Sequence, residues 1–77
     1  MSETDLKKVY GMFTSAWKFF HKYADMGDND QNWEAAVSES GQIAKEYGNS
    51  RLVRDLLSAS ISELERLKRE ERKNAES

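Results

Sequence analysis

The chain has 77 residues, a net charge of -2, and 34% charged against 38% hydrophobic residues, which indicates one small folded domain and not a disordered chain. It contains no cysteine, which excludes a disulfide framework, a thiolate zinc site and a cysteine nucleophile. No apolar run has the length of a transmembrane helix and the N-terminus lacks the apolar core of a signal peptide, so we expect a cytoplasmic protein.

The first predicted helix, about residues 4–25, carries most of the apolar surface, at the steps of three and four that place side chains on one helical face. Its main stripe comprises Leu6, Val9, Tyr10, Phe13, Ala16, Trp17, Phe20, Tyr23 and Ala24. A second, narrower stripe holds Met12, Phe19 and Met26 at heptad spacing, with Tyr23 between the two. A surface helix ordinarily has one apolar stripe, so we expect two further helices to cover the main stripe only.

The second predicted helix, about residues 30–47, follows a turn that Gly27 and its Asp and Asn neighbours indicate. Its apolar stripe is weaker and comprises Trp33, Ala36, Val37, Ser40, Ile43, Ala44 and Tyr47. The small residues in it allow close approach of the large aromatics of the first helix. We expect Gly48 to end this helix in a left-handed conformation.

The third predicted helix, about residues 50–72, has Asn49 or Ser50 as its cap, and a charged tail follows at 73–77. Its stripe comprises Val53, Leu56, Leu57, Ser60, Leu64 and Leu67. Three amphipathic helices joined by short turns predict a single all-α domain over residues 1–77, an up-down-up three-helix bundle. The predicted core comprises Phe13, Trp17, Phe20, Trp33, Val37, Ala44, Val53, Leu57, Ser60 and Leu64.

The middle of the chain is acidic, because residues 25–50 hold six acidic residues and one lysine, Lys45. The two flanking segments are mildly basic. This distribution predicts electrostatic complementarity within the bundle. An acidic surface for a basic partner is the alternative interpretation.

No residue pattern favours catalysis or metal binding. His21 is the single histidine and lies on the polar side of the first helix beside lysines, where a solvated side chain is the usual outcome. Asp28, Asp30, Asn32 and Glu39 match part of a calcium-loop count. Trp33 stands where that loop requires glycine, so helix capping is the better interpretation. We therefore predict no enzyme, no cofactor and no metal site.

Residues 43–57 resemble a helix-turn-helix motif, since Ala44 lies four positions before Gly48 and Leu57 falls where the second helix turns inward. The resemblance implies a small DNA-binding regulator whose Ser50, Arg51 and Arg54 would meet phosphate and bases. Arg54 and Asn49 depart from the motif, and the acidic second helix would repel a phosphate backbone. Nucleic-acid binding therefore remains the alternative function.

The chain also resembles the short uncharacterised all-helical proteins of phages and mobile elements of low-GC Gram-positive bacteria. The resemblance rests on the run Ala16-Trp17-Lys18-Phe19-Phe20-His21-Lys22-Tyr23-Ala24, on Trp33-Glu34, and on Gly48-Asn49-Ser50-Arg51. It implies a bacterial cytoplasmic origin and no particular activity.

Taken together, the sequence predicts a non-enzymatic helical protein–protein interaction module that associates with itself. The second apolar stripe would be left uncovered by a three-helix bundle, and pairing with a symmetry mate would remove it from water. We therefore predict a homodimer through Met12, Phe19, Tyr23 and Met26, with an unidentified protein partner as the competing occupant. A membrane-surface role for the first helix is disfavoured, because two further helices carry stripes that match its own.

Overall fold

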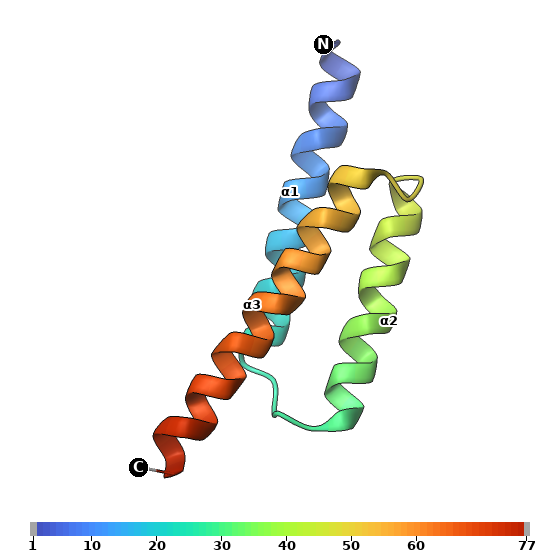
Figure 1. Cartoon of the computed structure of the whole chain (residues 1–77). Helices are drawn as coiled ribbons and strands as arrows, with labels where there is room; N and C mark the ends of the chain where they lie inside the picture. Colours follow the sequence, from blue (N-terminus) through green and yellow to red (C-terminus); the bar gives the residue numbers. More distant parts are fainter. Residues whose placement is uncertain (1, 77) are drawn as a thin grey trace.

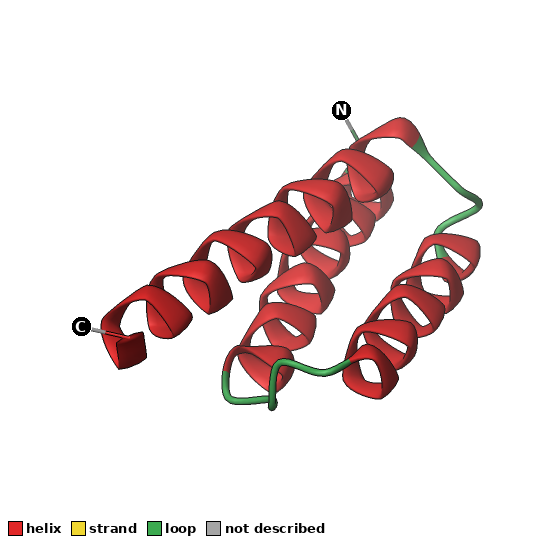
Figure 2. Ribbon diagram, turned by 60° about the horizontal axis from the view of Figure 1, so that its bottom comes forward, coloured by secondary structure: helices red, strands yellow, loops and turns green. Residues whose placement is uncertain are grey.

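Three α-helices make up the fold, and the computed structural model describes the backbone of residues 2–76 and the side chains of residues 2–73. The helices are α1 (Glu3–Ala24), α2 (Asp30–Glu46) and α3 (Arg51–Glu76). α1 and α3 run in the same direction and α2 runs back beside them (Figures 1 and 2). The predicted all-α, up-down-up bundle is confirmed. The molecule measures 51 × 20 × 17 Å, because the start of α1 and the end of α3 project from opposite ends.

Each helix begins at a polar side chain that caps it. The Ser2 hydroxyl accepts from the backbone N–H of Asp5 at 3.2 Å, and the Asn29 side chain accepts from that of Asn32 at 2.9 Å. The Ser50 hydroxyl accepts from the N–H of Val53 at 3.4 Å. These bonds satisfy donors that a helix leaves free in its first turn, and they fix the three starting points within a residue or two of those predicted.

The turn between α2 and α3 uses two consecutive left-handed residues. Gly48 has a φ of +66° and Asn49 a φ of +56°. The backbone N–H of Asn49 donates to the Ala44 carbonyl at 2.8 Å, and that of Gly48 donates to the Lys45 carbonyl at 3.0 Å. Both bonds satisfy carbonyls at the end of α2, so the predicted left-handed cap at Gly48 is confirmed.

The core lies mainly between α1 and α3, which share the largest helix–helix interface. Its buried apolar residues are Met12, Ala16, Phe19, Tyr23, Ala36, Ala44, Val53, Leu57 and Leu64. The two fully buried residues of α2 are alanines, as expected for a helix whose backbone comes close to its neighbours.

The predicted core is right for α3 and wrong for much of α1. Four of its ten residues are buried (Ala44, Val53, Leu57, Leu64) and three are half-buried (Phe20, Trp33, Ser60). Phe13, Trp17 and Val37 are instead 52%, 62% and 58% exposed. α1 therefore buries its narrower stripe together with Ala16 and Tyr23, and leaves four residues of its main stripe exposed: Leu6, Tyr10, Phe13 and Trp17.

Polar partners and a close helix approach explain this orientation. The Ser15 hydroxyl lies 3.2 Å from the Tyr47 hydroxyl, and Lys22 Nζ lies 2.6 Å from Glu39 Oε1. On the same side, a Cβ at Gly11 would lie 2.7 Å from Tyr47 Oη, so a larger residue at this position would require the Tyr47 side chain to shift. Rotating α1 to bury its main stripe would separate these polar pairs. A prediction based on apolar residues alone does not take such pairs into account.

α3 continues to Glu76, beyond the predicted end near residue 72. Its exposed side holds Arg66 between Glu63 and Glu70, at N···O distances of 2.6 Å and 2.7 Å. Pairs three and four residues apart support a helix with no apolar contact, so the charged segment stays helical. Of the predicted charged tail, Ser77 and the side chains from residue 74 on lie outside the described residues.

Lys68 is a buried charge at the junction of α3 with the end of α1. It is 2% exposed, and its Nζ donates to the Ala24 carbonyl at 2.6 Å and to Glu71 Oε2 at 3.3 Å. A cation at a helix C-terminus meets unpaired carbonyls and the negative end of the helix dipole. Lys68 thus ties the last turn of α1 to α3 where the apolar pattern of α3 stops.

Candidate functional site

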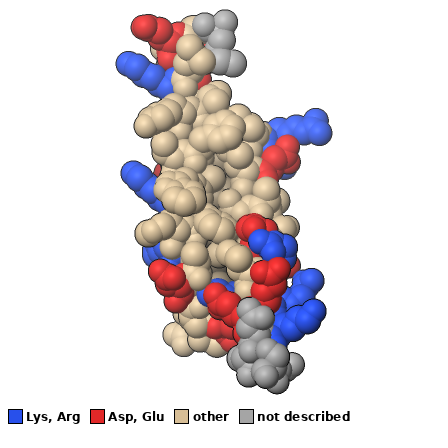
Figure 3. Space-filling model, turned by 90° about the vertical axis from the view of Figure 1, so that its left-hand side faces the viewer, with Lys and Arg blue, Asp and Glu red and all other residues tan. Residues whose placement is uncertain are grey.

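The most distinctive surface of the molecule is an apolar face along α1, formed by Leu6, Tyr10, Phe13 and Trp17, which we call the aromatic seam. Their exposed fractions are 54%, 70%, 52% and 62%. Single exposed apolar residues are ordinary, but four large ones on one helix face are not. Figure 3 shows a broad uncharged surface on this side of the molecule, with charged groups along its edges and near its lower end.

The spacing of the seam is that of a helix that pairs with another helix. Its positions follow steps of four, three and four, which average about 3.7 residues, close to one helical turn, and so keep the side chains on one line where a partner helix could lie along α1. The buried residues Met12, Ala16, Phe19 and Tyr23 follow the same steps. α1 therefore carries two such lines, of which the bundle covers one.

Trp17 lies at the centre of an aromatic group on this face. Its ring centroid is 6.2 Å from that of Phe20, with an interplanar angle of 24°, and 5.8 Å from that of His21. Stacking holds the indole in place while most of its surface still faces solvent. An exposed, pre-positioned tryptophan is the type of residue that dominates binding energy at protein interfaces.

The charges beside the seam are positive over most of its length. Between Asp5 and Asp25, α1 contains no acidic residue, whereas Lys7 and Lys18 lie about 100° around the helix from the seam and are exposed. Long lysine stems cover neighbouring apolar surface while their ammonium groups stay in water. Glu3 and Asp5 make only the first turn acidic.

The four residues predicted to form the dimer interface lie within or against the core of the protomer and not on an open surface. Met12, Phe19 and Tyr23 are 8%, 1% and 8% exposed inside the protomer's own core, and Met26 is half-buried against it. Placing them on an open surface was wrong, because α3 packs on this stripe. The surface left uncovered is the exposed part of the main stripe, which is the aromatic seam.

The polar edge of this buried stripe has shifted pKa values. The hydrogen bond from Lys22 Nζ to Glu39 raises the pKa of Lys22 above its ordinary value, and the Glu39 charge adds to that effect. Burial raises the pKa of Tyr23, and the nearby Glu39 carboxylate, 3.3 Å from the phenol oxygen, raises it further. This network joins α1 to α2 and has a structural role.

The candidate nucleic-acid contacts do not form a binding surface of the expected shape. The half-buried Ser50 hydroxyl caps α3 and contacts Met12 Sδ at 3.6 Å. Arg51 and Arg54 are exposed, and Arg51 Nε lies 3.8 Å from Asp55. α3 returns alongside α2 (Figure 1) instead of crossing it steeply as the second helix of a helix-turn-helix does.

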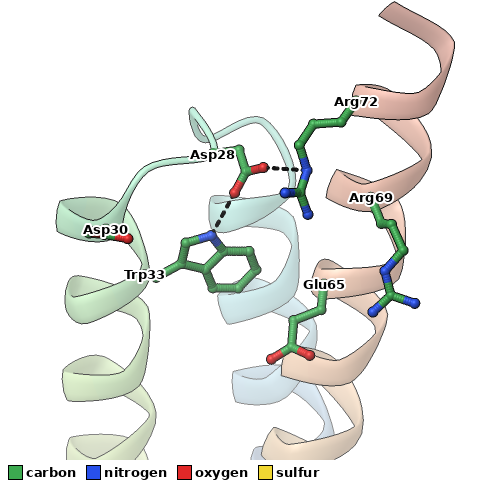
Figure 4. Close-up of a pocket in the computed structure, with 6 residues that line it drawn as sticks. All are labelled: Asp28, Asp30, Trp33, Glu65, Arg69 and Arg72. Atoms are coloured by element: carbon green, nitrogen blue, oxygen red, sulfur yellow. Dashed lines mark hydrogen bonds and ion pairs between the residues drawn. The ribbon is translucent and has the colours of Figure 1, made fainter. Parts of the chain in front are cut away.

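A polar hollow between the α1–α2 turn and α3 contains Asp28, Asp30, Trp33, Glu65, Arg69 and Arg72 (Figure 4). Asp28 accepts from Trp33 Nε1 at 2.8 Å and lies 2.9 Å from Arg72 Nε, so its carboxylate joins the turn to both helices. Of the possible calcium ligands, Asn32 donates to the Gly27 carbonyl and Glu39 binds Lys22. Among the described residues, no three acidic or histidine side chains gather as a metal site.

Within residues 2–76, no helix combines the length and the apolar character that crossing a membrane requires. No family model, no curated protein and no solved structure matches this chain.

Proposed function

We propose that this protein is a non-enzymatic helical interaction module that binds another polypeptide through the aromatic seam of α1. The single observation that carries the proposal is the exposure of four large apolar side chains, 52% to 70% each, on one face of an ordered helix. Burying them in a complex would remove from water an apolar surface that the bundle leaves open.

The composition of the seam supports a protein partner. Tyr, Trp and Phe are enriched in the centres of protein interfaces, and the charged residues that such centres exclude lie at the edges here. The steps of four and three favour a partner helix laid along α1 at a shallow angle. A role in the bacterial cytoplasm, in a phage or mobile element, stays a prediction from the sequence resemblance.

DNA binding is not proposed as a second function, because no observation favours it. Glu46 lies beside the turn that would approach the phosphate backbone, and Ser50 is already used as a cap. Catalysis has no support either, since His21, the one histidine of the chain, is exposed and lies tilted against Trp17.

Photo-cross-linking in the cells that make the protein tests the proposal. A benzophenone amino acid replaces Phe13 in one variant and Val37 in another, because both are large apolar residues, 52% and 58% exposed, on different helices. We expect a discrete protein adduct from position 13 and none from position 37. Equal labelling at both positions, or none at position 13, would contradict the proposal.

A further inference from the structure

We infer that the occupant of the aromatic seam is the same seam of a second copy, with the two α1 helices antiparallel about a two-fold axis near residues 11 and 12. The inference rests on the proposed function and names its partner. It differs from a dimer through Met12, Phe19 and Tyr23, which the bundle itself buries.

The seam is complementary to itself in this orientation. Its midpoint lies between positions 11 and 12, so Leu6 of one copy falls opposite Trp17 of the other, and Tyr10 opposite Phe13. Each contact then sets two different side-chain shapes against each other. A parallel pair would instead place Trp17 on Trp17 and Phe13 on Phe13, which sets identical side-chain shapes against each other.

The shape of the protomer also suits an antiparallel pair. Ser50, at the start of α3, contacts Met12, and Tyr47, at the end of α2, lies against Gly11. The first turns of α1, residues 3–10, therefore extend beyond the other two helices, as Figure 1 shows. In an antiparallel pair this extension lies over residues 13–20 of the other copy, and the two bundles point away from each other.

The flanking charges also fit. With the midpoint between 11 and 12, Glu3 falls beside His21 of the other copy and within one turn of its Lys18. Lys18 of the other copy falls between Glu3 and Lys7 on the same flank, and its flexible stem lets the ammonium group approach Glu3 and turn away from Lys7. Opposite charges thus meet at both ends of the pairing.

The area is sufficient for a modest dimer. Since one aromatic side chain offers about 150–250 Å², the exposed fractions correspond to roughly 350–550 Å² of seam on each copy. Two copies would bury about 700–1,100 Å² from these residues alone. The half-buried Phe20 and the lysine stems bring the total near the roughly 1,000–1,200 Å² at which specific interfaces begin.

Sedimentation equilibrium of the purified protein at micromolar concentration tests the pairing. The parent should be a dimer, and Trp17→Glu should raise the dissociation constant at least tenfold without loss of helical circular dichroism, because this side chain is outside the core. Val37→Glu is the matched control, since it adds the same charge at an equally exposed apolar site, and should leave the dimer intact.

Cross-linking of cysteine variants tests the orientation, because the parent chain has no cysteine. Glu3→Cys and His21→Cys should give covalent dimers with a short bismaleimide only when the two variants are mixed. In an antiparallel dimer made of one variant only, the two thiols would lie roughly 25 Å or more apart, too far for the short cross-linker. Cross-links within each single variant would indicate a parallel pair and overturn the inference.

The outcomes separate this inference from the proposed function. A parent that is monomeric at tens of micromolar, or a Trp17→Glu variant that remains as dimeric as the parent, overturns self-pairing. An adduct at position 13 with a mass other than twice that of the chain would then identify a different protein on the seam, and the proposed function would stand. Tight binding of the parent to lipid vesicles with no protein adduct would overturn both.

Discussion

Trp17 and Phe19 stand two positions apart on α1, yet Trp17 is 62% exposed and Phe19 is 1% exposed. Two positions correspond to about 200° around a helix, so both cannot face the same core. Their apolar character gives no preference between them. The preference for Phe19 comes from polar contacts that hold α1 in this orientation. They are made by Glu39, Tyr47 and Lys68.

Gly48 provides a test of backbone conformation alone. It has a φ of +66°, and a Cβ added there would meet nothing within 4 Å, so Gly48→Val introduces strain without a clash. We expect the free energy of unfolding in urea to fall by about 1 kcal/mol or more. Gly41→Ala is the control, because Gly41 is helical and equally open, and it should stabilise the protein by up to about 1 kcal/mol.

The Glu39 network predicts a loss of stability at alkaline pH. The pKa values of Lys22 and Tyr23 are both raised, so the folded protein holds these protons more tightly than the unfolded chain. The stabilisation is complete below about pH 10, the ordinary range of these groups, and is lost as pH rises through the folded pKa values.

Thermal melts between about pH 8 and pH 11.5 check this expectation. The Tm of the parent should fall over the alkaline part of that range, and Glu39→Gln should reduce the dependence because it removes the carboxylate that raises both pKa values. Glu34→Gln removes another carboxylate from the same helix, one that forms no ion pair with Lys22, and should leave the curve unchanged. Parallel curves of Tm against pH for the parent and Glu39→Gln would show that Glu39 is not the source of this pH dependence.

Among the elements, the helices themselves are the part that sequence reasoning predicts best. Capping residues and glycines locate the starts and the α2 end within a residue or two, because those signals are local. The orientation of α1 is not local, since it depends on Tyr47 and Glu39 of α2 and on Lys68 of α3. The alternation of four and three in Leu6, Tyr10, Phe13 and Trp17 could have revealed a second pairing face.

A pair of alanine substitutions tests which apolar residues form the core. Leu57→Ala should cost about 2–5 kcal/mol, because the side chain is 3% exposed and its removal leaves a cavity. Trp17→Ala should change the stability of the monomer by less than about 1 kcal/mol, since its ring is largely exposed. Chemical denaturation at a concentration low enough to avoid association measures both. A larger loss for Trp17→Ala would mean that the seam is inside the bundle.

At the scale of the whole molecule, the acidic middle of the chain is used within the bundle. Glu39 binds Lys22 of α1, and Asp28 binds Arg72 of α3, so acidic residues of the middle segment meet basic residues of both flanking helices. This agrees with the complementarity predicted from the charge distribution. Exposed pairs contribute little stability each, so a small bundle with an open apolar face gains most from burying that face.

Quenching of Trp17 fluorescence by acrylamide is the most direct test of an aromatic seam that is open in the protomer and covered in the dimer. Trp33→Phe makes Trp17 the only tryptophan, and the protein is then diluted from tens of micromolar to nanomolar. We expect the quenching constant to rise several-fold on dilution, as the dimer separates and the indole becomes accessible. A low constant at every concentration would place Trp17 inside the bundle, and a high constant at every concentration would show that the seam does not pair with itself.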